Sequence, residues 1–323
     1  MNRPAMSLEV SEAGRTDLDQ RPSLQDLAGM FLDDLDVSDI SRAVYGRSLK
    51  QFFCWLERTG RRDQLGQLTR EDVLAYKRDL DATGHSATTI SSYLSVVRQL
   101  YSWLEAKRIS PNIARGVRGA RRPRGFRRDC LTPDQIRQAL QMLDGGQQGG
   151  LRDYAILNLL ARTGLRTIEV ARATVGDLRQ ESGQAVLWIQ GKGRDSKDDF
   201  VLLLPETLQP IRLYLWIRQE EAGQPLPDGA PLFCSDSDRN AGQALTTRSI
   251  SRIVKTALRR IGLDHHRLTA HSLRHSAISM AIRGGASLQQ AQAMARHSDP
   301  KTTMIYAHNM DRVKDGAEKF ITI

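Results

Sequence analysis

The histidines of this chain are unevenly distributed, and their cluster is the first feature with possible chemistry. Six of the seven lie between residues 265 and 308. His271 and His275 are four residues apart on one helical pattern, a spacing that zinc ligands also use. The segment HSLRH lacks the glutamate of the H-E-x-x-H motif, however, and Arg274 would repel a divalent cation. We therefore predict no metal site; any one of these histidines alone is also typical of a satisfied core position.

The residues that accompany these histidines form a second unusual group. Arg166 follows a glycine-containing turn in TGLRTIEV, Lys192 lies in the segment GKG, and Tyr306 comes nine residues after His297. Each arginine alone is typical of a surface ion pair. Together with Arg274 these segments supply two arginines, a lysine, two histidines and a tyrosine.

A set of this composition suits attack on a phosphodiester without a metal ion. The transition state spreads negative charge over the non-bridging oxygens, and guanidinium groups donate paired hydrogen bonds to such oxygens at any working pH. Arg166 and Arg274 are the candidates for this role. A free tyrosine has a pKa of about 10, so its phenol must lose a proton as it attacks, and the departing oxygen must gain one.

Helical periodicity predicts the elements that precede this group. Residues 1–22 are polar and acidic and are expected to form a flexible terminus. Residues 23–113 carry four successive segments with apolar residues three and four apart, which predict a four-helix bundle. Ser23 and Asp26 resemble a capping box at its start. The residues predicted to face inward in the first two helices are Leu24, Leu27, Phe31, Leu35, Ile40, Val44, Phe52, Trp55 and Leu56.

An abrupt change of composition follows at residues 114–129. The segment ARGVRGARRPRGFRRD holds seven arginines, three glycines, one proline and one acid, which predicts a linker rather than a regular element. A solvated hinge is one interpretation, and a strap that binds nucleic-acid phosphates is the one that the charge favours. The candidate DNA-binding residues are Arg115, Arg118, Arg121, Arg122, Arg124, Arg127 and Arg128.

Residues 130–323 are predicted to form a second, mostly helical domain with a small antiparallel sheet. The apolar runs AVLWIQ and DFVLLL flank the sequence GKGRDSKD, which predicts a hairpin with a long basic tip. This tip carries Lys192, although Lys197 could in principle serve the same purpose. The fold class is thus mainly α in both domains.

Composition limits the function classes. The chain of 323 residues has a net charge of +10 and a sequence pI near 9.8, and because residues 1–40 carry −6, the remaining residues carry +16. This balance favours a polyanionic partner, with a merely cationic surface as the alternative. Three separated cysteines predict neither a disulfide framework nor a zinc ribbon. Without a signal peptide or an apolar span, the expected location is the cytoplasm.

The motifs resemble those of the tyrosine recombinases, the phage integrase family, and they occur in the family's order. TGLRTIEV is similar to the first-arginine box, GKG at 191–193 to the lysine hairpin, HSLRHSAISMAI to the His-x-x-Arg box and RHSDPKTTMIYAH to the boxes that end in the tyrosine. TREDVLAYKRDL and TTISSYLSVVRQLYSWLEA resemble the helical core-binding domain. The resemblance covers about residues 23–310 and implies a SAM-like core-binding domain followed by an α-rich catalytic domain.

The resemblance also implies a role for each candidate. Tyr306 would be the nucleophile and would store the phosphodiester as a 3′-phosphotyrosine, so that strands are rejoined without ATP or another cofactor. Lys192 would be the general acid, His271 would assist proton transfer, His297 would hold the phosphate, and Glu169 would orient the site through a hydrogen bond. The full implied set is Arg166, Glu169, Lys192, His271, Arg274, His297 and Tyr306.

Two departures from the family pattern leave these side chains in place. Arg296 stands where the family commonly has glycine before the histidine, so that the local backbone is expected to differ. The segment SPNIARGV replaces the usual Asn-Pro order after the fourth helix.

The assembly implied by the resemblance is a Xer-like, two-domain recombinase that clamps a duplex DNA site. Two protomers would bind one site, and four would exchange strands through a Holliday junction, with accessory DNA-binding proteins as further partners and no membrane. A mobile element would use this chemistry for integration, excision or cointegrate resolution. A type IB topoisomerase and a non-catalytic DNA-binding protein are the alternatives; the core-binding match and short length argue against the first, and Tyr306 with its partners against the second.

Overall fold

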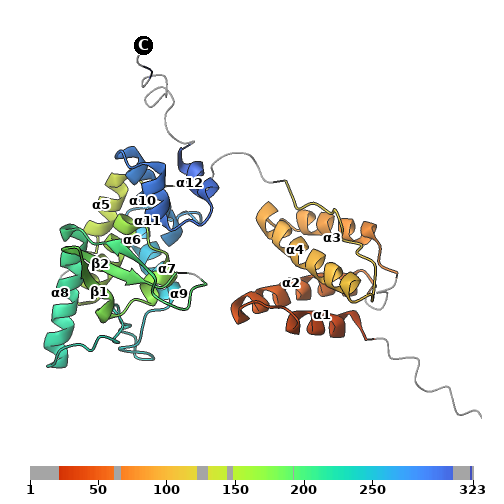
Figure 1. Cartoon of the computed structure of the whole chain (residues 1–323), viewed down its shortest axis with the longest axis horizontal. Coiled ribbons are helices and arrows are strands. Elements are labelled where there is room, and N and C mark those ends of the chain that lie inside the picture. The colour runs from red at the N-terminus through yellow and green to blue at the C-terminus, as the bar shows by residue number, and fades with distance from the viewer. Residues whose placement is uncertain are drawn as a thin grey trace, which may run out of the picture. The chain divides into compact units, whose positions relative to one another are not determined.

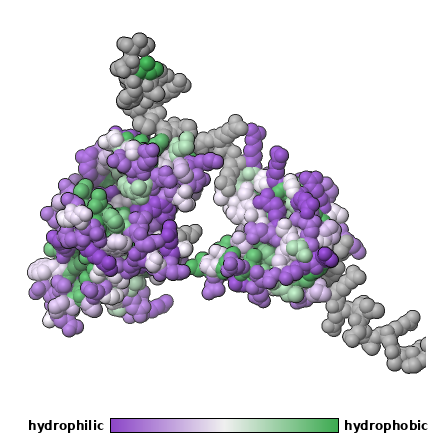
Figure 2. Space-filling view, in the orientation of Figure 1, coloured by the Kyte–Doolittle hydropathy of each residue, from purple (hydrophilic) through white to green (hydrophobic). Residues whose placement is uncertain are grey.

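The computed structural model describes residues 22–61, 67–121, 130–143, 148–191, 193–307 and 321. The chain divides into two compact units, Met1–Arg124 and Gly125–Ile323, each considered by itself (Figure 1). The face of each unit visible in Figure 2 is mostly hydrophilic, with scattered apolar residues. Across the described ranges, no helix combines the length and apolar character needed to cross a membrane.

The N-terminal unit is a helical bundle around its own core, as predicted. Its described helices are α1 (Leu24–Asp33), α2 (Asp39–Arg58), α3 (Arg70–Ala82) and α4 (Ala87–Ala106) (Figure 1). The predicted capping box begins α1, because the backbone N–H of Ser23 donates to Asp26 at 3.0 Å and the N–H of Asp26 donates to the Ser23 hydroxyl at 3.2 Å. Phe31 and Phe52 lie in the core.

The predicted inner face of α2 is wrong at its beginning. Ile40 and Val44 are 77% and 43% exposed, and the buried residues of this helix begin only at Ser48. Periodicity identifies the side of a helix that faces a core, but it carries no information on how far the neighbouring helices extend along it.

The structure also corrects the predicted linker over its first half. Ala114 and Val117 are fully buried members of the N-terminal core. The ammonium group of Lys77 donates to the carbonyls of Arg118 and Gly119 at 3.0 and 3.3 Å. Residues 114–121 therefore pack on the bundle, because their backbone carbonyls find donors on its helices. Residues 122–129 lie outside the described ranges.

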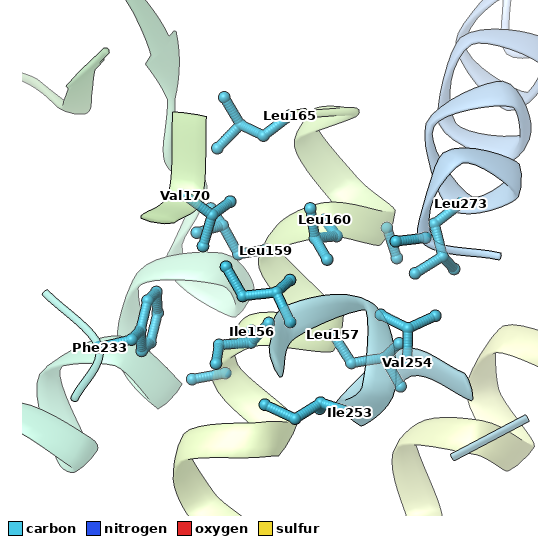
Figure 3. Packing of buried hydrophobic residues seen from close by; sticks show 14 of the residues in the cluster. Ile156, Leu157, Leu159, Leu160, Leu165, Val170, Phe233, Ile253, Val254 and Leu273 are labelled. Carbon is cyan, nitrogen blue, oxygen red and sulfur yellow. The ribbon is translucent and has the colours of Figure 1, made fainter. Parts of the chain in front are cut away.

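The C-terminal unit surrounds one deeply buried helix. Its described elements are α5 (Pro133–Gln141), α6 (Gln148–Thr163), α7 (Thr167–Ala171), the 3₁₀ turn η1 (Val175–Asp177), β1 (Leu178–Glu181), β2 (Gln184–Ile189), β3 (Asp199–Leu202), α8 (Pro205–Ala222), α9 (Thr247–Arg260), α10 (Ala270–Arg283), α11 (Leu288–Ala295) and α12 (Pro300–Ala307). Figure 3 shows Ile156, Leu157, Leu159 and Leu160 of α6 among Phe233, Ile253, Val254 and Leu273. This core is the rigid support for the segments that carry the candidate site.

The predicted hairpin is present and extends into a third strand. β2 pairs antiparallel with β3, with Leu187 opposite Val201, and also with β1, a strand that the periodicity did not predict. Ser182 and Gly183 make the tight β1–β2 turn with φ of 50° and 75°, which is typical of a two-residue hairpin turn.

Candidate active site

Arg166 and Glu169 lie at the beginning of α7, where two buried neighbours hold the backbone. Leu165 and Val170 are each 1% exposed and belong to the core shown in Figure 3. The fully buried Glu169 carboxylate accepts hydrogen bonds from the Arg166 backbone N–H at 2.7 Å and from Arg166 Nη1 at 2.8 Å. The Glu169 carboxylate thus binds both the backbone and the side chain of Arg166 in this conformation.

Arg274 on α10 is 2% exposed and connects two other segments of the site. Its Nη1 donates to the carbonyl of Gly164 at 2.5 Å, and its Nη2 donates to the carbonyl of Ala295 at the end of α11. Burial, followed by the nearby charges of Arg166 and Arg296, lowers the pKa of Arg274 to about 10. The guanidinium thus remains charged at neutral pH.

The turn before Arg166 requires glycine. Gly164 has a φ of +62°, and an added Cβ would lie 3.4 Å from the side chain of Ala277 on α10. The same close approach allows the Gly164 carbonyl to accept the hydrogen bond from Arg274. Gly164, the glycine of the first-arginine box, therefore helps to position Arg274.

Tyr306 on α12 is 3% exposed and lies against two histidines from different segments. Its hydroxyl is hydrogen-bonded to Nδ1 of His275, which is also 3% exposed. The ring of His297 lies nearly parallel to the Tyr306 ring, with centroids 6.3 Å apart, and its Nδ1 is hydrogen-bonded to Thr303 Oγ1 at 2.9 Å. His271 is exposed one turn before His275, and the two ring centroids are 4.4 Å apart.

Arg296 adopts a left-handed backbone conformation, with a φ of 52°, at the position where we expected the backbone to differ. Its carbonyl accepts a hydrogen bond from Arg166 Nη2 at 3.3 Å. Its own side chain is 8% exposed, and its guanidinium forms an ion pair with Glu169 at 2.9 Å. A third arginine is thus present in the group.

Lys192 lies outside the described residues, whereas the alternative lysine, Lys197, lies within them. The ammonium group of Lys197 forms an ion pair with Asp177 at 2.5 Å and donates to Thr174 Oγ1 at 3.1 Å. Because the Asp177 side chain is only 3% exposed, this pair braces η1 against the hairpin. Lys197 therefore has a structural role in this conformation.

Three of the seven arginines of the predicted DNA-binding strap are among the described residues. Arg115 is engaged with Glu105 at 2.5 Å, whereas Arg118 and Arg121 lie in the segment that packs on the N-terminal bundle. The remaining predicted contacts, Arg122, Arg124, Arg127 and Arg128, are outside the described residues. Among the residues that are described, no group of three or more His, Cys, Asp or Glu side chains is arranged to hold a metal ion.

Sequence reasoning missed two contributors to this group. For His275 the sequence suggests only a metal ligand or a satisfied core histidine, although its position beside Arg274 in HSLRH is an available signal. Arg296 was noted only for its backbone. The described members of the group, excluding Lys192, are Arg166, Glu169, His271, Arg274, His275, Arg296, His297 and Tyr306. Such a group can bind an anionic phosphate through its guanidinium groups beside a phenol nucleophile.

Comparison with known proteins defines the class to which this fold and site belong. Residues 129–312 match the phage integrase family, and residues 30–108 match the N-terminal SAM-like domain of phage integrases. A tyrosine recombinase of Synechococcus elongatus is 30% identical over 87% of this chain and 88% of its own. The tyrosine recombinase XerD of Listeria monocytogenes is 24% identical over 92% of this chain and 97% of its own.

Solved structures show the same fold. XerH bound to palindromic difH has a TM-score of 0.71 at 19% identity and covers 92% of this chain and 85% of its own. The Tn1549 transposon integrase in complex with transposon right-end DNA has a TM-score of 0.72 at 17% identity and covers 93% and 99%. The chain belongs to the phage integrase family, and it is an enzyme of the tyrosine recombinase type, which cleaves and rejoins DNA at specific sites.

Proposed function

We propose that this chain exchanges DNA strands through a 3′-phosphotyrosyl intermediate in which Tyr306 is the nucleophile. The observation that carries the proposal is the group around Arg274. The guanidinium of Arg274 ties the segment before Arg166 to the end of α11, and Tyr306 contacts the neighbouring residue of α10. Side chains from three separate parts of the sequence thus lie close together, which supports a phosphate site among them.

In the proposed reaction, the Tyr306 oxygen attacks phosphorus and the bond from phosphorus to the 5′-oxygen breaks. The tyrosine proton leaves as the new bond forms, and the 5′-oxygen receives a proton from a general acid. Arg166 and Arg274 donate to the non-bridging oxygens, where negative charge increases in the transition state. The reverse attack, by a 5′-hydroxyl of another strand, conserves the bond and needs no ATP.

Lys192 is the proposed general acid. In the sequence it falls between β2 and β3, two strands whose register is defined. The other lysine between these strands, Lys197, is engaged with the buried Asp177, which supports Lys192 as the residue that reaches the substrate. His271, which is exposed beside His275, is proposed to assist the proton transfer.

The proposed partner is a duplex DNA recombination site, bound in the cytoplasm. XerH is bound to difH in its structure, and a lambda integrase dimer is bound to a core site in another. Two copies of this chain on one site would follow the lambda integrase dimer. Four copies in a synapse joined through a Holliday junction are proposed from the family resemblance alone. Because the Tn1549 transposon integrase is solved in complex with transposon right-end DNA, a mobile element is the proposed context for integration, excision or cointegrate resolution.

Replacement of Tyr306 by Phe tests the nucleophile. We expect Tyr306→Phe to bind DNA but to form no covalent protein–DNA adduct, because the ring remains and the attacking oxygen is lost. The adduct is measured after denaturation, on a duplex selected by this chain from a random pool. Tyr154→Phe, on α6, is the matched control and should form the adduct. A 3′-linked adduct in Tyr306→Phe at the normal rate would refute the assignment.

The alternative classes are separated by two further assays. Relaxation of a supercoiled plasmid without exchange between two copies of the selected site would indicate a type IB topoisomerase. Sequence-specific binding with neither reaction would indicate a DNA-binding protein that lacks catalysis. Exchange between two sites, abolished by Tyr306→Phe, is the outcome that we expect.

A further inference from the structure

Arg296 combines features that are unusual for a surface arginine. Its backbone is in the left-handed region, with a φ of 52°, which is unfavourable for a side chain with a Cβ. Its side chain is nevertheless 8% exposed and lies beside Glu169, a residue distant in the sequence. A residue that is both strained and buried at this place invites a functional explanation.

The hydrogen bonds of Arg296 divide the Glu169 carboxylate between two arginines. Arg166 Nη1 binds Oε1 at 2.8 Å, whereas Arg296 Nη2 binds Oε2 at 2.9 Å. Arg296 Nη1 also donates to the Met294 carbonyl at 2.6 Å. Its Nε is buried and has no hydrogen-bond partner among the described residues. The group thus retains one buried donor that its internal contacts do not use.

The charges of this group favour a phosphate more strongly when Arg296 is counted. Arg166, Arg274 and Arg296 with Glu169 carry a net charge of +2, whereas without Arg296 the net charge is +1. A phosphodiester carries −1, and its pentacovalent transition state carries a second negative charge. The positive charges of Arg166 and Arg296 also contribute to the lowered pKa of Arg274, after its burial.

We propose that Arg296 is a positioning residue of the phosphate site. It holds one oxygen of Glu169, so that Glu169 orients Arg166 without neutralising the site, and it adds the positive charge that matches the transition state. The inference extends the proposed function, since the phosphate is then that of the DNA backbone. Arg296 acts through Glu169 and through its charge, and no contact with the substrate is required.

Cleavage of two substrates tests this role. Arg296→Met preserves length but removes the charge, Arg296→Lys preserves the charge, and Arg296→Gly removes the backbone strain. We expect Arg296→Met and Arg296→Gly to form the Tyr306 adduct about 10- to 100-fold more slowly than the unmodified chain. On a duplex with a methylphosphonate at the scissile position, which has one negative charge fewer, the loss should shrink to a few-fold. Arg296→Lys should recover most of the rate.

Inorganic phosphate provides a test that does not need cleavage. Its affinity for the intact chain is measured from the rise of the unfolding midpoint with phosphate concentration. We expect about 5- to 10-fold weaker binding for Arg296→Met and Arg296→Gly, because a charge near the anion is lost. Arg137→Met removes an exposed positive charge of α5 that is paired with Asp134, and it should bind phosphate like the unmodified chain.

The outcomes separate the two proposals. If Arg296→Met and Arg296→Gly slow the cleavage of both substrates to the same extent and leave the phosphate affinity unchanged, Arg296 has only a structural role, and the inference is overturned. Equal rates and affinities in all variants would overturn it as well. If the unmodified chain forms no adduct on any selected duplex, the proposed function fails, while the phosphate affinities still decide whether Arg296 belongs to an anion site.

Discussion

The Tyr306 hydroxyl and His275 Nδ1 form a hydrogen bond between two side chains that are each 3% exposed. In this conformation Tyr306 lies within the protein, so in the proposed reaction DNA binding must make its oxygen accessible to phosphorus. The same bond gives Tyr306 a structural contribution in addition to the chemical role that we propose for it. Stability must therefore be measured alongside adduct formation whenever Tyr306 is changed.

A double-mutant cycle isolates that contribution. His275→Leu, Tyr306→Phe and the double variant each lose the hydrogen bond, so that their effects on the free energy of unfolding should not add. We expect a coupling of about 1 kcal/mol from urea unfolding. Ile278 on the same helix is fully buried, and Ile278→Val combined with Tyr306→Phe serves as a packing control. Strictly additive effects of His275→Leu and Tyr306→Phe would contradict the bond.

Lys192 and Lys197, which both fall between β2 and β3 in the sequence, are predicted to have different roles, one in catalysis and the other in stability. Lys192→Ala should slow cleavage by about 10² to 10⁴, the usual range for a lost general acid. A 5′-bridging phosphorothioate should restore its rate, because sulfur leaves without a proton, but it should not restore Tyr306→Phe.

Lys197→Ala should instead lower the free energy of unfolding by about 1 to 3 kcal/mol, since the buried Asp177 loses its partner. Its residual cleavage should be insensitive to the sulfur substitution. Rescue of Lys197→Ala in place of Lys192→Ala would reverse the assignment, and rescue of neither would make His271 the next candidate.

At the scale of elements, α8 shows how a helix can contain a proline without breaking. Pro210 lies inside α8 and has no N–H for the carbonyl of Glu206, one turn earlier. Asn158 on α6, which is 2% exposed, donates its Nδ2 to that carbonyl at 2.7 Å. The side-chain amide thus replaces the missing backbone donor, and α6 and α8 are joined where the helix would otherwise be weakest.

This replacement is testable by a second cycle. Asn158→Ala should lower the free energy of unfolding by about 1 to 3 kcal/mol, because a buried carbonyl is left without its donor. In a Pro210→Ala background the restored N–H can bond to the Glu206 carbonyl within the helix. The cost of Asn158→Ala should then be smaller, as measured by urea unfolding. An equal cost in both backgrounds would show that Asn158 acts by another contact, such as the one to Arg162.

The two units of the molecule have separate cores. In the sequence, the arginine-rich segment 114–129 includes the boundary between them. Each phosphate contact contributes about −0.9 to the slope of log K against log salt on duplex DNA. Replacing Arg121, Arg122, Arg124 and Arg127 with Gln should therefore flatten the slope by up to about 3 to 4, on any DNA sequence.

The structure supplies a control for this measurement. Arg115 is paired with Glu105, so that Arg115→Gln should change the slope less than the other replacements do. A slope that is unchanged in the fourfold variant would mean that the segment is a free hinge. Binding affinities of all variants are compared over the same range of salt concentration.

The family of this protein and most of its helices could be predicted from the sequence alone. Two arginines, a lysine, two histidines and a tyrosine suit phosphodiester chemistry because of their charges and proton affinities, and the order of their motifs resembles that of the phage integrase family. Helices such as α1 and α4 were predictable because they depend on neighbours three and four positions away. The antiparallel hairpin of β2 and β3 was predictable from its short apolar runs.

Which side chains contact one another depends on how the helices pack and could not be predicted from the sequence. The contact of His275 with Tyr306 spans 31 positions, that of Arg296 with Glu169 spans 127, and that of Asn158 with Glu206 spans 48. No local period carries such pairings, since they result from how whole helices pack. For the same reason the exposure of Ile40 and the docking of residues 114–121 on the bundle could not be predicted: both depend on where neighbouring helices end.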